Sequence, residues 1–314
     1  MTRSPIVDAH VHVLPPRPGL GAPKRDPYDI WEYGNLEGVD VLEAAGTIEQ
    51  VVDAMQQAHC DHFVVVNMFV PENELAKMAI ETAAFPRPSL ADSRDVLQER
   101  LREFNRWALD LAAGRDDMTP FVAADPHVLG GPKGADHLRW AVDLGARGIK
   151  IHPIAQAFLP DDPAMYDTYR ACAESGAAVI AHAGAAKGST QWAEPNAYAA
   201  VLRDHPDLRV VLAHLGGARW RQAADLAAAF PNVSFDLCEI VAWVGAPGAP
   251  TRDELAMMIR EIGADRVLFG TDYPWYDVEA TIHQVMDLPY LSAEEKDGIL
   301  GANAIRILGL AVRV

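Results

Sequence analysis

Eight short apolar runs recur along the sequence, and amphipathic segments of helical period separate most of them. The runs are rich in β-branched and small residues and cover residues 6–10, 63–67, 121–124, 148–152, 178–182, 210–214, 233–237 and 267–271. Strands that alternate with helices are typical of a parallel sheet built from βαβ units. Eight such units predict an α/β fold, a (β/α)8 TIM barrel, and we expect residues 1–314 to form a single domain of this kind.

The expected helices begin with Thr, Asp, Pro or other residues that often stand at helix starts. They cover residues 47–59, 95–113, 163–175, 195–205, 219–230 and 251–262, and the tail over 292–308 predicts two short helices packed on the outside. Segments 14–35 and 71–93 are irregular, and each follows a strand. Because the loops after barrel strands build the active-site face, we expect both segments to cover a substrate.

Polar side chains gather at the carboxyl ends of the apolar runs. A barrel brings these strand ends around one axis, so side chains that are far apart in sequence become neighbours in one pocket. The candidates at these ends are His10 and His12, Lys150 and His152, His182, His214 and Asp272.

Four of these side chains form a plausible set of metal ligands. His10 and His12 are two residues apart on a strand and therefore face the same side, where both imidazoles can bind one cation. With His182 and Asp272 they offer three nitrogens and one carboxylate oxygen, which suits a divalent ion, with Zn²⁺ expected. The alternatives are an exposed histidine pair, a structural role for His182 and His214, and a turn or helix cap at Asp272.

Lys150 leaves the number of ions open. A neutral, buried lysine can be carboxylated and then bridge a second ion, whereas a charged amine would hold a substrate carboxylate. A third reading is an ion pair with Asp125. We favour one ion, because the sequence gives no independent sign of the desolvated environment that carboxylation needs.

The segments DAHVHVLP, GIKIHP, VIAHAG, VVLAHLGG, LFGTDYPW and GANAIRILGL follow one another along nearly the whole chain. In this order they resemble the amidohydrolase superfamily, specifically amidohydrolase family 2, the group related to aminocarboxymuconate semialdehyde decarboxylase. The resemblance implies metal binding by His10, His12, His182 and Asp272, and it makes His214 the catalytic histidine. It also implies that Asp272 accepts a proton from water in the hydrolases. Lys150 stands where binuclear members carry the bridging lysine, and in that pattern His214 would be a ligand too.

Three functions follow from this set of residues. The first is a metal-dependent hydrolase of an amide, ester or lactone in a small organic substrate, with Asp272 as the base. The second is a nonoxidative decarboxylase of an aromatic or unsaturated carboxylic acid, with His214 beside the metal. The third, a non-catalytic metal-binding barrel, is weaker because every expected ligand is present. Trp31, Trp192, Trp243 and Trp275 are expected to line the substrate pocket or to pack within loops.

The charge and the cysteines exclude several other classes. The formal net charge of −17 would repel a nucleic-acid backbone or an anionic membrane. Cys60, Cys172 and Cys238 are odd in number and far apart, so they predict neither a disulfide framework nor a thiolate metal site. With no apolar segment typical of a signal peptide or a membrane span, we expect a cytoplasmic enzyme with a small-molecule substrate, and a homo-oligomer is left open.

Overall fold

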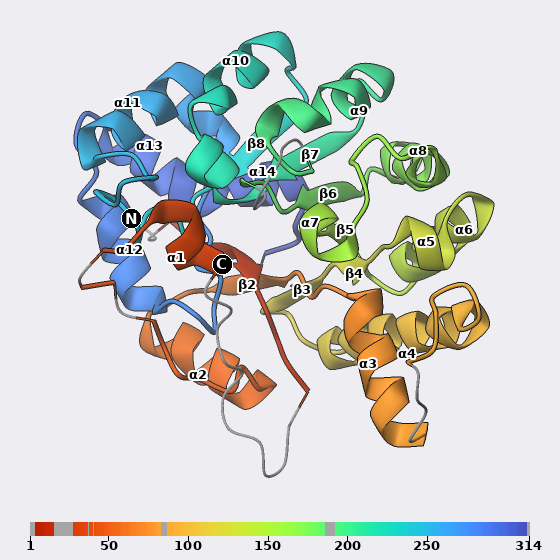
Figure 1. Cartoon of the computed structure of the whole chain (residues 1–314). Helices are drawn as coiled ribbons and strands as arrows, with labels where there is room; N and C mark the ends of the chain where they lie inside the picture. The colour runs from red at the N-terminus through yellow and green to blue at the C-terminus, as the bar shows by residue number, and fades with distance from the viewer. Residues whose placement is uncertain are drawn as a thin grey trace.

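The computed structural model describes residues 4–15, 28–36, 38–39, 41–82, 87–185 and 192–312. Within these residues, parallel strands form a barrel that is surrounded by helices (Figure 1). The strand segments are β1 (Val7–Val11), β2 (His62–Val65), β3 (Met118–Pro120), β4 (Val122–Ala123), β5 (Gly148–Ile151), β6 (Ala178–Ala181), β7 (Arg209–Leu212), β8 (Val233–Asp236) and β9 (Val267–Leu268). The predicted TIM barrel is confirmed.

Segments β3 and β4 are two parts of the third predicted strand. The strand starts at Met118, three residues earlier than expected, and it is interrupted at Phe121. The N–H of Phe121 still donates to the Val65 carbonyl at 2.9 Å, so the interruption does not open the barrel. The ring closes where the N–H of Ala9 in β1 donates to the Phe269 carbonyl, which follows β9, at 2.9 Å.

Helices connect the strands and surround the barrel (Figure 1). The longer helices are α2 (Ile48–Gln57), α3 (Pro71–Thr82), α4 (Arg94–Ala112), α6 (Pro132–Asp143), α8 (Tyr166–Ser175), α10 (Gln222–Ala229), α11 (Arg252–Ile262) and α12 (Val278–Met286). The shorter ones are α1 (Tyr28–Tyr33), α5 (Pro126–Leu129), α7 (Pro153–Gln156), α9 (Ala199–Asp204), α13 (Ala293–Asp297) and α14 (Asn303–Leu308). Short 3-10 segments are η1 (Pro163–Met165), η2 (Pro195–Tyr198) and η4 (Ala264–Arg266), the kinked segment η3 covers Ala213–Arg219, and the π-helical segment η5 covers Gly298–Ala302.

Two of the expected irregular segments contain helices. Helix α3 occupies much of segment 71–93; its first residue is Pro71, and Glu72 and Glu74 lie in the first turn, where acidic side chains favour the helix dipole. Helix α1 ends segment 14–35, of which residues 16–27 lie outside the described part of the chain. Local helix-start signals therefore outweighed the mixed composition of these segments.

The C-terminal tail packs against the strands as well as the outer layer. In α14, Ala304, Ile307 and Leu308 join a buried cluster that includes Val7 of β1 and Leu268 of β9. The guanidinium of Arg209, at the start of β7, donates to the Ile307 carbonyl at 2.8 Å. The two short helices expected over 292–308 are α13, which has no buried side chain, and α14, which closes the end of the barrel at which the strands begin. In the part of the chain that is described, no helix combines the length and apolarity that a membrane span requires.

Candidate metal centre

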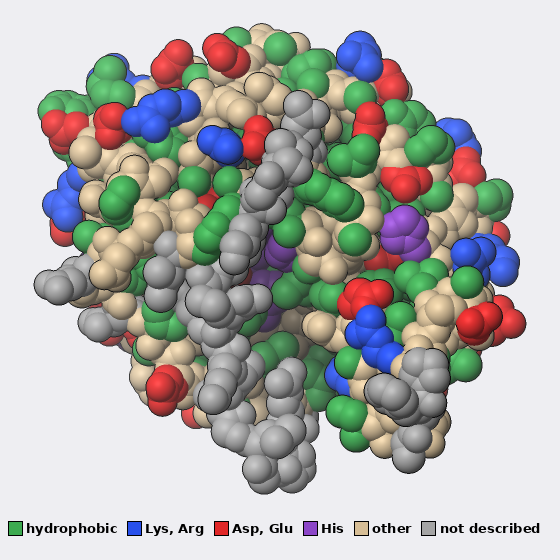
Figure 2. All heavy atoms as spheres, in the orientation of Figure 1, with side chains coloured by type: hydrophobic (Ala, Val, Ile, Leu, Met, Phe, Trp, Pro, Cys, Tyr) green, Lys and Arg blue, Asp and Glu red, His purple; other side chains and the backbone are tan. Residues whose placement is uncertain are grey.

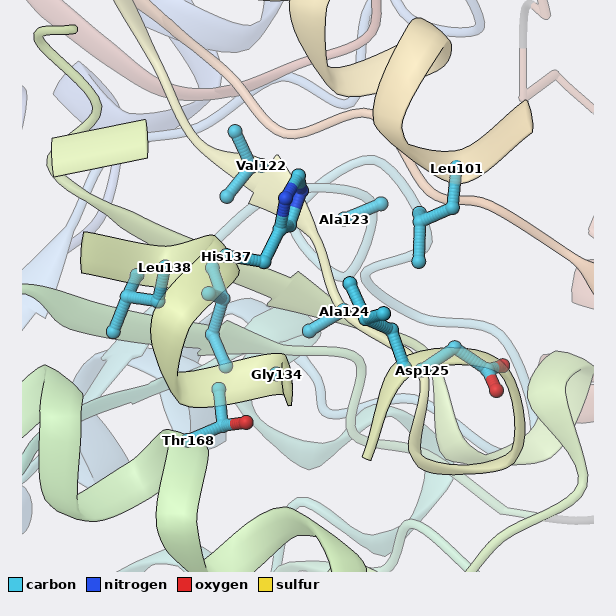
Figure 3. A pocket seen from close by; sticks show the side chains of 11 residues that line it. Leu101, Val122, Ala123, Ala124, Asp125, Gly134, His137, Leu138 and Thr168 are labelled. Atoms are coloured by element: carbon cyan, nitrogen blue, oxygen red, sulfur yellow. The ribbon is translucent and has the colours of Figure 1, made fainter. Parts of the chain in front are cut away.

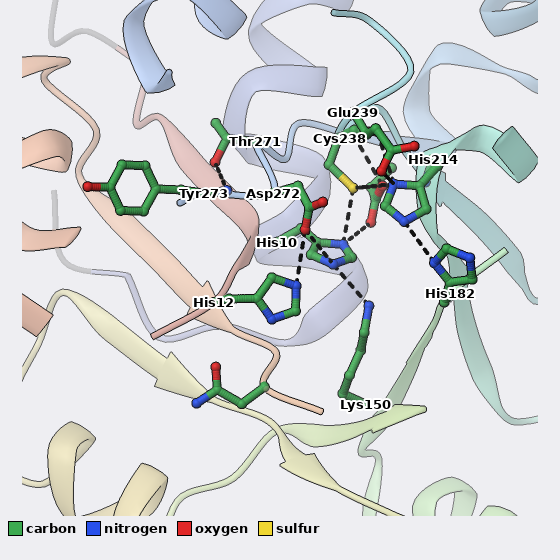
Figure 4. Close-up of polar contacts among 12 residues, drawn as sticks. His10, His12, Lys150, His182, His214, Cys238, Glu239, Thr271, Asp272 and Tyr273 are labelled. Atoms are coloured by element: carbon green, nitrogen blue, oxygen red, sulfur yellow. Dashed lines mark hydrogen bonds and ion pairs between the residues drawn. The ribbon is translucent and has the colours of Figure 1, made fainter. Parts of the chain in front are cut away.

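The carboxyl ends of β1 and β9 bring His10, His12 and Asp272 together (Figure 4). The N–H of Asp272 donates to the His10 carbonyl at 2.9 Å, and the N–H of His12 donates to the Tyr273 carbonyl at 2.8 Å. Asp8 strengthens this joint, because its buried carboxylate accepts a hydrogen bond of 2.5 Å from the Thr271 hydroxyl. Backbone pairing between the first and last strands thus places the three side chains at one point.

The three side chains fit a divalent cation. The Nε2 atom of His12 lies 3.0 Å from Oδ1 of Asp272, and Nε2 of His10 lies 3.6 Å from the same oxygen. All three ligand atoms lie within 4.8 Å of one another, and all three residues are buried. A buried carboxylate beside two imidazole nitrogens is a chemically suitable donor set for Zn²⁺ or a similar ion.

Asp236, at the end of β8, orients His10 and was missed in the sequence. Its Oδ2 atom lies 2.8 Å from Nδ1 of His10, which places the proton on Nδ1 and leaves Nε2 as an acceptor, 2.9 Å from the Lys150 amine. Its Oδ1 atom accepts the backbone N–H of His214 at 2.8 Å. Burial raises the pKa of Asp236, but the electrostatic interaction with the His10 ring and the hydrogen bond to it outweigh burial and hold the pKa below the ordinary value. The rule that found the other candidates, a polar residue at a strand end, applies equally to Asp236.

Cys238 and Glu239, which follow Asp236, also lie in the site. The Cys238 thiol donates to Oδ1 of Asp236 at 2.7 Å, and burial raises its pKa well above the ordinary value. The sulfur of Cys238 also lies within 4.8 Å of ligand atoms of His10 and Asp236, and these three residues form a second group that could hold a metal ion. The Glu239 carboxylate lies 3.8 Å from Nδ1 of His214.

His182 and His214 form a pair beside the three-residue cluster. Nδ1 of His182 lies 3.1 Å from Nε2 of His214, and the Tyr198 hydroxyl donates to the His182 carbonyl at 2.6 Å. The ring of His214 lies 5.5 Å from that of His10, measured between centroids. Among the described residues, His182 does not belong to the groups whose ligand atoms lie within 4.8 Å of one another, so the structure places this predicted ligand next to the cluster and not inside it.

The histidines of the site are neutral at pH 7. Burial, the largest cause, lowers the pKa of His10, His12 and His182 below the ordinary value and lowers that of His214 to about 4. Asp272 is ionised, because the hydrogen bond from His12 outweighs the effect of burial and holds the pKa of the carboxyl below its ordinary value. Neutral imidazoles and an ionised carboxylate are the protonation states that metal binding requires.

Lys150 points from β5 into the same cluster. Its amine lies 2.9 Å from Nε2 of His10, and burial lowers its pKa. Asp125 instead caps α5, where it accepts the N–H groups of His127 and Val128. The reading of Lys150 as the ion-pair partner of Asp125 is therefore wrong. On the same strand face, His152 stacks on His182 with the ring centroids 3.8 Å apart.

The tryptophans divide between the site and the loops. Trp275 contacts His12, with ring centroids 5.0 Å apart. Trp243 stacks on Tyr33 and donates to the Tyr276 hydroxyl at 2.6 Å, so it packs loops together. Trp192 is half-buried after β6, and Trp31 is exposed. Trp275 is thus placed against a predicted ligand, whereas Trp243 belongs to loop packing.

Figure 2 shows histidine side chains deep in the middle of one face of the molecule. A separate small cavity lies between α4, α6 and β4 and is lined mainly by apolar side chains together with His137 (Figure 3). Asn105 fixes that histidine through a 2.9 Å contact with Nε2. The predicted site residues do not line this cavity.

Comparisons with known proteins agree with the geometry. Residues 7–310 match the amidohydrolase family. A 2-amino-3-carboxymuconate-6-semialdehyde decarboxylase from Dictyostelium discoideum is 25% identical over 202 residues, with 55% of this chain and 56% of the relative covered, so the match spans about half of the relative's length.

Solved structures share the fold at low sequence identity. A 5-carboxyvanillate decarboxylase from Sphingomonas paucimobilis has a TM-score of 0.64 at 15% identity, covering 98% of this chain and 100% of that one. A structure described as a candidate 2-pyrone-4,6-dicarboxylic acid hydrolase from Pseudomonas putida has a TM-score of 0.62 at 17% identity, covering 99% and 100%. Together, the family match over nearly the whole chain and the barrel with its histidine and aspartate cluster show that this chain belongs to the amidohydrolase family of enzymes.

Proposed function

We propose that the protein is a metal-dependent nonoxidative decarboxylase of a planar aromatic or unsaturated carboxylic acid. The observation that carries the proposal is the decarboxylase relative, whose match extends over half of this chain. The site supports it, since the buried Lys150 amine lies beside the cluster of His10, His12 and Asp272 and can bind an anionic substrate. This choice departs from the sequence-based preference for hydrolysis.

His10, His12 and Asp272 would hold the ion, with His182 as the fourth candidate ligand and Zn²⁺ as the expected metal. A divalent ion bound there supplies Lewis-acid chemistry, which polarises a coordinated substrate oxygen and lowers the pKa of coordinated water. One ion is favoured, because His182 and His214 contact each other through the ring nitrogens that a second ion would need. The burial of Lys150 nevertheless provides the desolvated amine that carboxylation requires.

The reaction breaks the bond between the substrate carbon and its carboxylate, releases CO₂ and leaves an electron pair on that carbon. The same carbon must then take a proton. We assign this proton to Nε2 of His214, because the ring lies beside the cluster and its backbone is fixed by Asp236. An anionic substrate next to the ring raises the pKa of His214 and so favours the protonated form that donates. Trp275, against His12, offers an aromatic wall for a planar substrate.

Hydrolysis of a lactone, ester or amide is the second candidate. The observation that favours it is the ionised Asp272 carboxylate, which can accept a proton from a water molecule. Hydrolysis would use the same ligands, but Asp272 would be the base and no carbon would be protonated.

A substrate panel separates the two reactions. The metal-loaded protein is incubated with hydroxybenzoic acids, unsaturated dicarboxylic acids, lactones and amides, and CO₂ release is followed in parallel with acid release. We expect CO₂ from a carboxylic acid and its loss when the metal is removed by a chelator. Acid release from a lactone or amide without CO₂ from any acid would overturn the decarboxylase proposal in favour of hydrolysis.

A further inference from the structure

Glu32 in α1 carries a carboxylate that is buried between two loops of the barrel. Glu32 is only 8% exposed. Its Oε1 atom accepts hydrogen bonds from the N–H of Ala185 at 2.9 Å and from the N–H of Ala218 at 2.8 Å. Ala185 lies three residues after His182, and Ala218 lies four residues after His214. A buried carboxylate is costly unless it is hydrogen-bonded, so these contacts define its position.

Two glycines make room for this carboxylate. A Cβ atom added at Gly217 would lie 2.0 Å from Oε1 of Glu32, and one added at Gly184 would lie 2.6 Å from it. The three atoms nearest to the added carbon at Gly184 all belong to Glu32. The loops after β6 and β7 are therefore shaped around a side chain that comes from the loop after β1.

The backbone that carries His214 needs such support. His214 and Leu215 have φ values of 59° and 52°, a left-handed conformation that is unfavourable for residues other than glycine. The left-handed run continues through Gly216 and Gly217. Asp236 accepts the N–H of His214 at the start of this run, and Glu32 accepts the N–H of Ala218 directly after its end. Two buried carboxylates thus hold both ends of the run.

We propose that Glu32 is a positioning residue for the active site. It fixes the loops after β6 and β7 relative to each other, so that His182 and His214 keep their 3.1 Å contact. It also ties α1, which packs against η3, to the loops that follow β6 and β7. We call the hydrogen bonds from the amides of Ala185 and Ala218 to Glu32 the clamp. The clamp can be tested without a substrate, and only its effect on turnover rests on the proposed function.

Amide hydrogen exchange tests the clamp directly. In Glu32→Ala, we expect the amides of Ala185 and Ala218 to exchange about tenfold faster or more, since each loses a hydrogen bond to a charged group. Glu32→Gln, which keeps an acceptor oxygen, should give a smaller increase at both sites. Glu43→Ala, an exposed acidic residue nearby, is the matched control and should change neither. Unchanged exchange at both amides in a folded Glu32→Ala protein would overturn the proposal.

Gly184→Ala breaks the same clamp from the opposite side. The new methyl group must displace the Glu32 carboxylate, so the amide of Ala218, on a different loop, should also exchange faster. In the Glu32→Ala background the methyl group meets no carboxylate, and Gly184→Ala should then have little further effect. Equal effects of Gly184→Ala in the two backgrounds would contradict the clamp.

Metal content and turnover complete the test. The bound metal should remain in Glu32→Ala, because His10, His12 and Asp272 lie on other elements, while kcat falls and Glu32→Gln restores part of it. If the decarboxylase proposal fails, the exchange results still decide whether Glu32 acts as a clamp. Full turnover in Glu32→Ala with accelerated exchange would contradict the positioning role.

Discussion

Asp236 is the residue on which the orientation of the metal centre depends. It contacts Nδ1 of His10 through one oxygen and the backbone of His214 through the other. A ligand histidine held in this way keeps one tautomer and one ring orientation. The proposed metal ligand His10 and the proposed proton donor His214 are therefore both positioned by one buried carboxylate.

Replacing that carboxylate should weaken metal binding. For Asp236→Asn we expect about 10- to 100-fold lower affinity for Zn²⁺, the usual cost of losing an outer-shell partner. Affinity is measured by competition with a chromogenic chelator, with Asp110→Asn on the exposed face of α4 as the control. An affinity equal to that of the unmodified protein would show that His10 needs no such support.

Asp272 should matter for catalysis beyond its contact with the histidines. Asp272→Asn keeps the size of the side chain but removes its charge, and we expect kcat to fall about 100-fold or more, as when a proton-transfer or ligand group is lost. Steady-state rates of metal-loaded protein give the comparison. An unchanged kcat would show that Asp272 is only a turn residue, a role that its left-handed backbone (φ of 62°) would explain.

Buried neutral histidines predict the direction of the pH dependence. The pKa of His214 is about 4 in the folded chain and lies below the ordinary value of 6.5, so the unfolded chain binds more protons between these values. The free energy of unfolding of the metal-free protein should therefore fall as the pH drops from about 6.5 toward about 4. Urea titrations at several pH values measure it, and His214→Gln should show a shallower fall. Equal slopes for the two proteins would assign the acid sensitivity to other groups.

At the scale of elements, the order of strands and helices was predictable because hydrophobic period and helix-start residues act locally. The predicted strand 178–182 and the predicted helix 251–262 each differ from the observed elements, β6 and α11, by one residue at one end. The loop geometry was not predictable, since Glu32 and Gly217 meet through contacts between distant segments. In the site, strand-end position alone identified His10, His12 and Asp272, whereas the pairing of His182 with His214 depends on side-chain packing.

The helix that closes the barrel should contribute to stability independently of the site. Leu308 of α14 is fully buried against the strands, so Leu308→Ala should lower the free energy of unfolding by about 2–5 kcal/mol, the usual range for a large-to-small core change. Metal content should not change. Leu159→Ala, at a residue that is 49% exposed, is the control for thermal and urea unfolding. A loss of metal in Leu308→Ala would show that the two ends of the barrel are coupled.

In the whole molecule, the candidate metal ligands lie at the end of the barrel where the strands finish, and the apolar side chains of α14 close the end where the strands begin. The first and last strands meet at the metal centre, so residues more than 250 positions apart in sequence, His10 and Asp272, act as one unit. In a chain with a net charge of −17, the buried Lys150 amine is an isolated basic group beside His10, and it attracts an anionic substrate when it is protonated.

Metal analysis of the purified protein tests whether His10, His12 and Asp272 bind a metal ion. We expect about one divalent ion per chain in the unmodified protein and in Trp275→Phe. Folded His12→Ala should lose most of that ion, because His12 supplies one of three clustered ligand atoms. Full metal content in His12→Ala would contradict the site. Two ions per chain, together with a mass increase equal to CO₂ on Lys150, would contradict the single-ion centre.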